Sequence, residues 1–88
     1  MEREGMMLLE ELKRASEKAV GTRETKKALD EDRVARVFIA RDAEEYVVRP
    51  VIDMSQQRSV DVVYVDSMSQ LGKACGISVG AASAGILR

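Results

Sequence analysis

The sequence contains no histidine and no tryptophan, and it has a single cysteine, a single proline, one phenylalanine and two tyrosines. Without histidine, the side chain most often used as a general base near neutral pH is missing. The carboxylates are scattered along the chain and do not cluster with the spacing of metal ligands. The sequence therefore predicts a protein that is not an enzyme and that has no catalytic residues, no metal site and no cofactor.

Long apolar runs are also missing, so no segment is expected to span a membrane. The start of the chain, residues 1–5, is charged, and no sustained apolar segment follows it, which argues against a signal peptide. The one cysteine, Cys75, cannot form a disulfide within the chain. A reducing compartment suits such a sequence, and we expect a cytoplasmic protein.

Hydrophobic residues make up 45% of the 88-residue chain and charged residues 33%. This balance is typical of a folded globular domain and argues against disorder. A chain of this length buries roughly 60–65% of its surface on folding, which is enough for one core but not for a deep active site. We therefore expect a single domain over residues 1–88, and nothing in the sequence suggests more than a monomer.

The net charge is −1, which argues against nucleic-acid binding through a large basic patch. The charges are nevertheless unevenly distributed. Residues 21–41 carry six basic and four acidic groups, and the rest of the chain carries eight basic and eleven acidic groups. If the protein binds RNA, it should therefore do so through a small and specific site.

Hydrophobic spacing and capping residues predict alternating helices and strands in the first half of the chain. A helix is predicted over residues 6–20, and Gly21 interrupts it. Thr22 is predicted as the N-cap of a second helix, at about 22–31, which should end early because three acidic residues lie near its C-terminus. Residues 34–40 are predicted to form a central strand, since the later part of this segment is apolar on both faces.

In the middle of the chain, Asp42 is predicted to cap a third helix, with Glu45 as its capping-box partner. Pro50 lies some way into this pattern and would remove a helical hydrogen bond. We therefore expect a break, with either a short turn before Pro50 or a helix that starts near Arg49. Residues 60–65 are predicted to form a second strong strand.

The last part of the chain begins with Ser67 and Gln70, which form a capping box for a helix that starts at Met68. Gly76 is expected to be left-handed just past the end of this helix, and residues 81–87 are predicted to form a final strand. The order of elements is α–(short β)–α–β–α–β–α–β. It predicts an α/β fold, a three-layer α/β/α sandwich with a mixed sheet of about four strands.

The helix that follows Gly21 is the first candidate for a binding site. At 100° per residue, its outward face carries Arg23 and Lys27, with Glu24 at the edge. A purely structural interpretation is a solvated face with an i,i+3 pair of Glu24 and Lys27, worth only about 0.2–0.5 kcal/mol. A functional interpretation is that the free N–H groups of the helix start face a phosphate, while Arg23 and Lys27 donate to guanine and Glu24 accepts from a base. The spacing alone leaves both interpretations open.

The loop of Gly76, Ile77, Ser78, Val79 and Gly80 is the second candidate. It can be an ordinary helix-to-strand connection, with Ile77 or Val79 packed inward. It can also be an apolar ledge under a flipped base, because sequence-specific RNA recognition favours unstacked nucleotides in loops and bulges.

Two other features carry less weight. The aromatic residues Phe38, Tyr46 and Tyr64 are too few to favour an aromatic stacking platform. Cys75 is expected to pack as a small buried hydrophobic residue, because a reactive thiol needs an electropositive and partly exposed setting.

Three segments taken together resemble a known family. They are Gly21–Leu29 (GTRETKKAL), Val37–Ala43 (VFIARDA) and Ser67–Ala82 (SMSQLGKACGISVGAA). In this order and spacing the chain resembles the kink-turn RNA-binding ribosomal protein family named L-seven-Ae, with the L-thirty-e fold, and most of all its short bacterial members. The resemblance extends from about residue 7 to residue 87.

The resemblance implies the three-layer fold and binding to a kink-turn, a duplex that bends sharply at a three-nucleotide bulge flanked by sheared G·A pairs. It implies that Glu24 and Lys27 contact the guanines of those pairs, and that Arg23 stands where relatives carry asparagine or lysine. It places the loop residues against the flipped-out nucleotides of the bulge. The complete set of implied RNA-binding residues is Gly21, Thr22, Arg23, Glu24, Lys27, Asp42, Lys73, Ile77, Ser78, Val79 and Gly80.

The hypothesis from the sequence is therefore a non-enzymatic, cytoplasmic protein that binds and stabilises kink-turn RNA, either ribosomal RNA or a structured regulatory RNA. Two alternatives remain. One is a protein–protein adaptor associated with the ribosome, with the same fold but without RNA specificity. The other is a small enzyme or phosphate-ligand protein that uses the start of the helix at Gly21 and Thr22.

Overall fold

The structure of the chain, a computed structural model, describes residues 2–88, with their side chains from Leu8 onward. Helices and strands alternate along these residues in the predicted order. Their bounds are α1 Glu2–Arg14, β1 Lys18–Val20, α2 Thr22–Asp30, β2 Val34–Ala40, α3 Glu45–Gln57, β3 Asp61–Val65, α4 Met68–Ala74 and β4 Ser83–Leu87.

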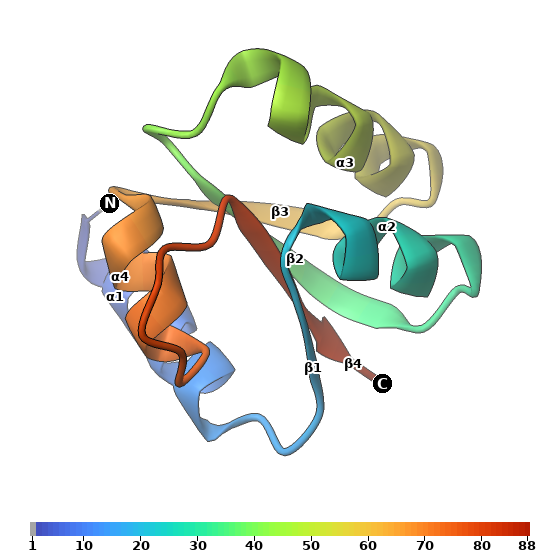
Figure 1. Cartoon of the computed structure of the whole chain (residues 1–88). Coiled ribbons are helices and arrows are strands. Elements are labelled where there is room, and N and C mark those ends of the chain that lie inside the picture. Colours follow the sequence, from blue (N-terminus) through green and yellow to red (C-terminus); the bar gives the residue numbers. More distant parts are fainter. Residues whose placement is uncertain (1) are drawn as a thin grey trace.

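The strands form one mixed sheet in the order β1-β4-β2-β3. β2 and β3 are parallel, whereas β4 pairs antiparallel with both β1 and β2. α1 and α4 lie together on one face of the sheet, and α2 and α3 lie together on the other (Figure 1). The predicted fold class, an α/β/α sandwich around a mixed sheet of four strands, is confirmed.

The central strand β2 is buried from both sides, as its sequence predicts. Phe38 and Ala40 belong to the core under α1 and α4, while Val37 and Ile39 belong to the core under α2 and α3. All four side chains are at most 1% exposed. This alternation follows from the period of two in a strand, and it explains why the segment reads as a continuous apolar run.

The prediction of a helix up to residue 20 is wrong, because α1 ends at Arg14 and residues 18–20 form the strand β1. Ala19 lies opposite Gly85 in the antiparallel pair of β1 and β4, and it is 7% exposed. The final strand begins at Ser83 and not at residue 81. Strand pairing over a long sequence distance therefore overrides a local helical spacing of alanines.

The prediction that Thr22 caps the second helix is also wrong. Gly21 is the N-cap of α2, with φ 95°, and Thr22 is the first helical residue. Gly21 has no side chain that could accept from the free N–H groups of the first turn, so these groups have no side-chain cap. The Gly21 carbonyl accepts the first hydrogen bond of the helix, from the Thr25 N–H at 3.0 Å, and another from the Thr25 hydroxyl at 2.7 Å. The positive φ at Gly21 is readily adopted by glycine alone.

Asp42 does not cap the third helix, which begins at Glu45 with Glu44 as an N-cap that makes no side-chain bond. Its Oδ1 instead accepts a hydrogen bond of 2.8 Å from the Met68 N–H at the start of α4. Asp42 therefore caps a helix that begins 26 residues later in the chain. The carboxylate also faces the positive end of the α4 dipole. It therefore stabilises α4 both by the hydrogen bond and by the interaction of its charge with the dipole.

The predicted break at Pro50 is absent from α3, which continues from Glu45 to Gln57 with the proline inside it. A proline at this position removes the N–H that would bond to the Tyr46 carbonyl. Tyr46 is 76% exposed and Pro50 is exposed, so both lie on the outer side of the helix. The buried side chains Val48 and Val51 hold α3 on the sheet, and packing therefore outweighs the lost bond.

Candidate functional site

The predicted site residues come from distant segments, and the topology brings most of those segments to one end of the sheet. β1, β2 and β3 run in the same direction, and β4 runs against them. Their carboxyl ends therefore lie beside the start of β4. α2, α3 and α4 begin at this end of the sheet, and the loop from α4 returns to it (Figure 1).

The start of α2 is held against the start of β4 through Ser83, a residue that is fully buried. The Gly21 N–H donates to the Ser83 carbonyl at 2.9 Å, and the hydroxyls of Thr22 and Ser83 share a hydrogen bond of 3.0 Å. Thr25, whose hydroxyl bonds to the Gly21 carbonyl, is also fully buried. These contacts fix the orientation of the first turn of α2.

The polar face of α2 is exposed, and its charged side chains are not paired with other described side chains. Arg23, Glu24 and Lys27 are all exposed, and none of them forms an ion pair with another described side chain. The pair of Glu24 and Lys27 that a purely structural interpretation expects is therefore not formed. Two donors and one acceptor are left available along one turn of a fixed helix.

The loop of residues 76–80 runs back along α4 and packs closely on it (Figure 1). A Cβ atom at Gly72 would overlap the carbonyl oxygen of Val79, and a Cβ at Gly80 would lie 3.0 Å from the Met68 Cβ. The Ile77 N–H donates to the Gly72 carbonyl at 3.1 Å. Gly72 therefore allows the loop to approach the helix, and the loop packs directly on α4.

The two apolar side chains of this loop point in different directions. Ile77 is half-buried and packs against the core beneath α1 and α4, as the structural interpretation expects. Val79 is 68% exposed, and Ser78 and Gly80 are exposed as well. The structure therefore presents Val79 as the apolar contact of this loop, with Ile77 as its support. Gly76 has φ 80°, as predicted for the residue that ends the helix.

The two remaining predicted residues are placed differently. Asp42 lies among the converging segments, because its carboxylate binds the Met68 N–H and the neighbouring Ala81 N–H donates to the Met68 carbonyl at 3.0 Å. Lys73 is exposed in the last turn of α4, and its side chain makes no hydrogen bond or ion pair with another described residue. The geometry thus joins Asp42 to the site, whereas Lys73 is placed with it only by lying on α4.

Unpaired positive charge collects on the elements of the site. The described lysines and arginines of the chain otherwise form ion pairs with carboxylates at several places on the surface. On α2, on the loop after β2 and on α4, the cations without such a pair are Arg23, Lys26, Lys27, Arg41 and Lys73. The same segments also carry Glu24, Asp42 and Glu44, which form no ion pair with a described residue either. This surface therefore offers separate donors and acceptors and is not a strongly basic patch.

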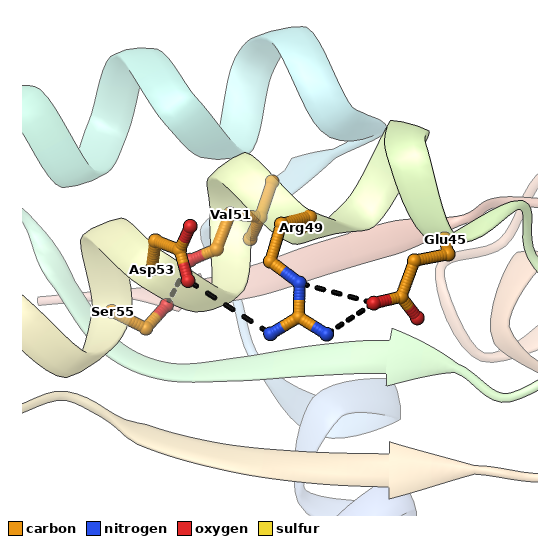
Figure 2. A network of polar contacts seen from close by, with 5 residues as sticks. All are labelled: Glu45, Arg49, Val51, Asp53 and Ser55. Carbon is orange, nitrogen blue, oxygen red and sulfur yellow. Dashed lines mark hydrogen bonds and ion pairs between the residues drawn. The ribbon is translucent and has the colours of Figure 1, made fainter.

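Two groups away from the site have shifted pKa values. Arg49 on α3 bonds to Glu45 and lies 3.9 Å from Asp53, and the hydrogen bond from Arg49 to Glu45 raises the pKa of its guanidinium (Figure 2). Burial raises the pKa of the Cys75 thiol, with Lys18 acting weakly in the opposite direction. The structure therefore agrees with the expectation that Cys75 packs as a buried hydrophobic residue.

A shallow depression with a volume of about 370 Å³ is lined by Glu10, Glu11, Arg14, Ala15 and Ile86. It lies near the carboxyl end of β4, at the end of the sheet away from the converging segments. Within the described residues, no three histidine, cysteine, aspartate or glutamate side chains come together to hold a metal ion. No helix of the described chain is long and apolar enough to cross a membrane.

Three supporting residues were not predicted from the sequence. Gly72 makes room for the loop, and Thr25 and Ser83 hold the start of α2. A glycine inside a predicted helix is a usable signal, since it costs stability unless close packing requires it. Ser83 has no local signal, because its hydroxyl partner Thr22 is 61 residues away in the chain.

The structure thus defines a small α/β/α domain with an exposed polar helix start and an adjoining loop at one end of the sheet. Residues 3–88 match the ribosomal protein L7Ae/L30e/S12e/Gadd45 family, and the chain belongs to this family. The family that the sequence resembles is therefore confirmed.

Named relatives and a solved structure agree with this assignment. The RNA-binding protein BH0128 of Halalkalibacterium halodurans is 47% identical over 77 residues, which cover 88% of this chain and 94% of that protein. The RNA-binding protein TTE2299 of Caldanaerobacter subterraneus is 45% identical over 67 residues, covering 76% and 82% of the two chains. The 15.5kD RNA binding protein of Giardia lamblia has a similar structure, with a TM-score of 0.84 and 27% identity over 94% of this chain and 72% of that one. These relatives are named for RNA binding and not for catalysis.

Proposed function

We propose that this protein binds and stabilises kink-turn RNA, and that it reads the sheared G·A pairs and a flipped bulge nucleotide. The family membership and the names of the relatives support an RNA partner. The observation that carries the proposal is the fixed arrangement of the start of α2 beside β4, made by Gly21, Thr22 and Ser83. It presents exposed donors and an acceptor at the end of the sheet where the apolar loop also arrives.

Each part of this surface matches a part of the RNA. Sheared G·A pairs leave guanine edges free in a widened groove, where Lys27 and Arg23 can donate to O6 and N7 and Glu24 can accept from N–H groups. The first N–H groups of α2 have no acceptor within the helix and suit a phosphate. Val79, supported by Ile77, offers an apolar surface to an unstacked base.

A small and rigid surface of this kind suits recognition of a bent shape. A protein that contacts only the bent form shifts the bending equilibrium by no more than its differential affinity for the two forms. The loop is held by Gly72 and the helix start by Ser83, so little conformational freedom is lost on binding. The RNA is a ribosomal RNA or a structured regulatory RNA, and the protein acts without catalysis, as one domain and as a monomer, in the cytoplasm.

Calorimetric titration of the protein into a short kink-turn duplex, at fixed salt and Mg²⁺, tests the proposal. The matched RNA control is the same duplex with its sheared G·A pairs replaced by Watson–Crick pairs. We expect nanomolar to low-micromolar binding to the first duplex alone. Equal affinity for both duplexes, or no binding to either, would overturn the proposal and favour a protein–protein adaptor with the same fold.

A further inference from the structure

Arg41 and Tyr64 form an exposed pair that is not among the residues assigned to the RNA. Arg41 directly follows β2, and Tyr64 is the next-to-last residue of β3. The guanidinium carbon of Arg41 lies 5.4 Å from the centre of the Tyr64 ring, within the range of a cation–π contact. The Tyr64 side chain is 43% exposed, and Arg41 is exposed as well.

The pair is built on the sheet and not on a free loop. Tyr64 lies opposite Ile39 in the parallel pair of β2 and β3, and Ile39 packs in the core under α2 and α3. Side chains alternate along a strand, so Tyr64 is on that same face, and so is Arg41, two residues beyond Ile39. The Arg41 N–H donates to the Val65 carbonyl at 2.8 Å, which continues the pairing of the two strands.

Arg41 differs from Arg49, the arginine of α3, in the groups that it contacts. Arg49 is held by Glu45 and lies near Asp53, so its charge is already matched (Figure 2). Arg41 makes no ion pair or hydrogen bond through its guanidinium with any described residue, and it lies over the ring of Tyr64. Its planar guanidinium therefore rests on a ring while its donors remain available to a ligand.

The position of the pair relates it to the proposed RNA site. In the sheet, β4 lies between β1, which leads into α2, and β2, which leads to Arg41. β3, which carries Tyr64, lies on the other side of β2. The Gly21 N–H bonds to Ser83, and the Ala40 N–H bonds to the neighbouring Ala82 carbonyl at 2.9 Å. The end of β1 and the end of β2 are therefore two strand spacings apart, which is on the order of 10 Å. Arg41 therefore lies at the same end of the sheet as the proposed RNA site, within the reach of a bound RNA strand.

We infer that Arg41 and Tyr64 stack an unpaired base of the bound RNA, next to the kink-turn and not within it; this inference rests on the proposed function. Unstacked bases bind to aromatic rings and to arginine planes, and such stacking tolerates any base because each has a π-face. Three aromatic residues alone are a poor platform for stacking bases. The Arg41 guanidinium lies over one of them, Tyr64, and offers a second flat surface on which a base can stack. The stacked base contacts Arg41, and Tyr64 holds Arg41 in place.

Affinity measurements with two forms of one RNA test this inference. The first is a blunt kink-turn duplex, and the second is the same duplex with four unpaired nucleotides added to one strand, at the 5′ end in one version and at the 3′ end in another. The variants are Arg41→Ala and Tyr64→Leu. Their matched controls are Arg33→Ala, an ion-paired arginine before β2 at the far end of the sheet, and Tyr46→Ala, an exposed tyrosine of α3 over whose ring no described arginine lies.

We expect one of the extended duplexes to bind the unaltered protein roughly five- to tenfold more tightly than the blunt duplex, at the low end of stacking on one base. Arg41→Ala and Tyr64→Leu should lose this gain, so that each variant binds the extended and the blunt duplex with the same affinity, and the controls should keep the gain. No gain from either extension, or a gain that survives both variants, would overturn the inference alone. Failure of the blunt duplex to bind the unaltered protein would overturn the proposed function and this inference with it.

Discussion

At the scale of single residues, substitutions of Glu24 and Lys27 test the proposed function most directly. Both are exposed on α2 and neither is paired with a described side chain, so truncating them should leave the stability of the fold nearly unchanged. We expect Glu24→Ala and Lys27→Ala each to weaken binding to a kink-turn duplex by about 1–3 kcal/mol, the scale of one good base contact. Calorimetric titration measures the change.

Matched substitutions on the same molecule separate this effect from a simple change of net charge. Glu31→Ala changes an exposed carboxylate past the other end of α2, and Lys13→Ala removes an exposed lysine on α1. Both should bind the RNA with nearly the affinity of the unaltered protein. Unchanged affinity in Glu24→Ala and Lys27→Ala would show that the start of α2 is not the site.

Cys75 gives a prediction about pH. Burial raises the pKa of its thiol in the folded protein, so the folded thiol stays protonated when the thiol of the unfolded chain ionises near its ordinary pKa of about 8.5. Below that pH the neutral thiol contributes its full stability. As the pH rises through about 8.5, the unfolded state loses a proton that the folded state keeps, and the free energy of unfolding falls.

Urea unfolding at several pH values between about 7 and 10 measures this dependence. The decline should be steeper in the unaltered protein than in Cys75→Ala, which has no thiol to ionise. Parallel curves for the two proteins would contradict the prediction. The pH dependence of the difference is the readout, because the smaller side chain of Cys75→Ala lowers stability by a constant amount at every pH.

At the scale of elements, the contact between α4 and the loop after it depends on Gly72. In an open helix position, replacing glycine by alanine is expected to gain about 1 kcal/mol. At Gly72 the added methyl group would overlap the Val79 carbonyl oxygen, so either the loop or the helix must move. We expect Gly72→Ala to lower the free energy of unfolding by about 1–3 kcal/mol and to weaken RNA binding by displacing Val79.

Urea denaturation measures the loss, and Gln70→Ala is the matched control, since Gln70 is an exposed side chain on the same helix. The control should stay within about 0.5 kcal/mol of the unaltered protein. A Gly72→Ala protein as stable as the control, or more stable, would show that the loop is not packed on α4 as closely as the structure has it.

Replacing Pro50 in α3 by alanine is expected to raise the stability of the fold, in contrast to Gly72→Ala. The helix continues through it and both Pro50 and Tyr46 are exposed, so an alanine there can supply the missing N–H without a clash. A proline inside a helix costs about 3 kcal/mol, and part of this is offset because proline also restricts the unfolded chain by about 0.4–1 kcal/mol. We expect Pro50→Ala to raise the free energy of unfolding by about 2–2.6 kcal/mol.

Urea denaturation again gives the value, with Gln56→Ala as an exposed control substitution on the same helix. The control should change stability by less than about 0.5 kcal/mol. A Pro50→Ala protein that is less stable than the unaltered one would mean that the proline ring makes packing contacts on the outer side of α3.

The elements also show what a sequence can and cannot specify. β2 was predicted over residues 34–40 with the bounds that the structure has, because an apolar run buried on both faces has a strong local pattern. The Ser67 cap of α4 and the left-handed Gly76 were predicted for the same reason. The bounds of β1 and the cap made by Asp42 were not predicted, because each depends on a partner far away in the chain.

The residues of the candidate site also fall into two groups, those that could be predicted from the sequence and those that could not. The residues that face outward, such as Glu24 and Val79, were available to sequence reasoning because their chemistry is local and their segments resemble a family. The residues that hold those segments in place, Thr25, Gly72 and Ser83, act through contacts that appear only in the folded chain. A candidate site can thus be proposed from exposed residues before the residues that support it can be found.

At the scale of the whole molecule, the charge distribution predicts how binding depends on salt. The chain has a net charge of −1, and the unpaired cations on the elements of the site are Arg23, Lys26, Lys27, Arg41 and Lys73. A protein that neutralises a few phosphates releases few counterions, so a plot of log K against log salt should have a slope between about −2 and −4. Titrations at four or five KCl concentrations, with Mg²⁺ held constant, measure it.

Substitutions on the same surface show which contacts set this slope. Lys27→Ala should lower affinity at every salt concentration, because it removes a base contact, whereas Lys26→Ala should reduce the steepness of the slope by at most about 1. A slope of about −7 or steeper would mean that bulk phosphate contacts dominate and that the RNA covers far more of the protein than this end of the sheet. A shallow slope together with discrimination against Watson–Crick pairs would instead mean that a nearly neutral molecule obtains its affinity from base edges and shape.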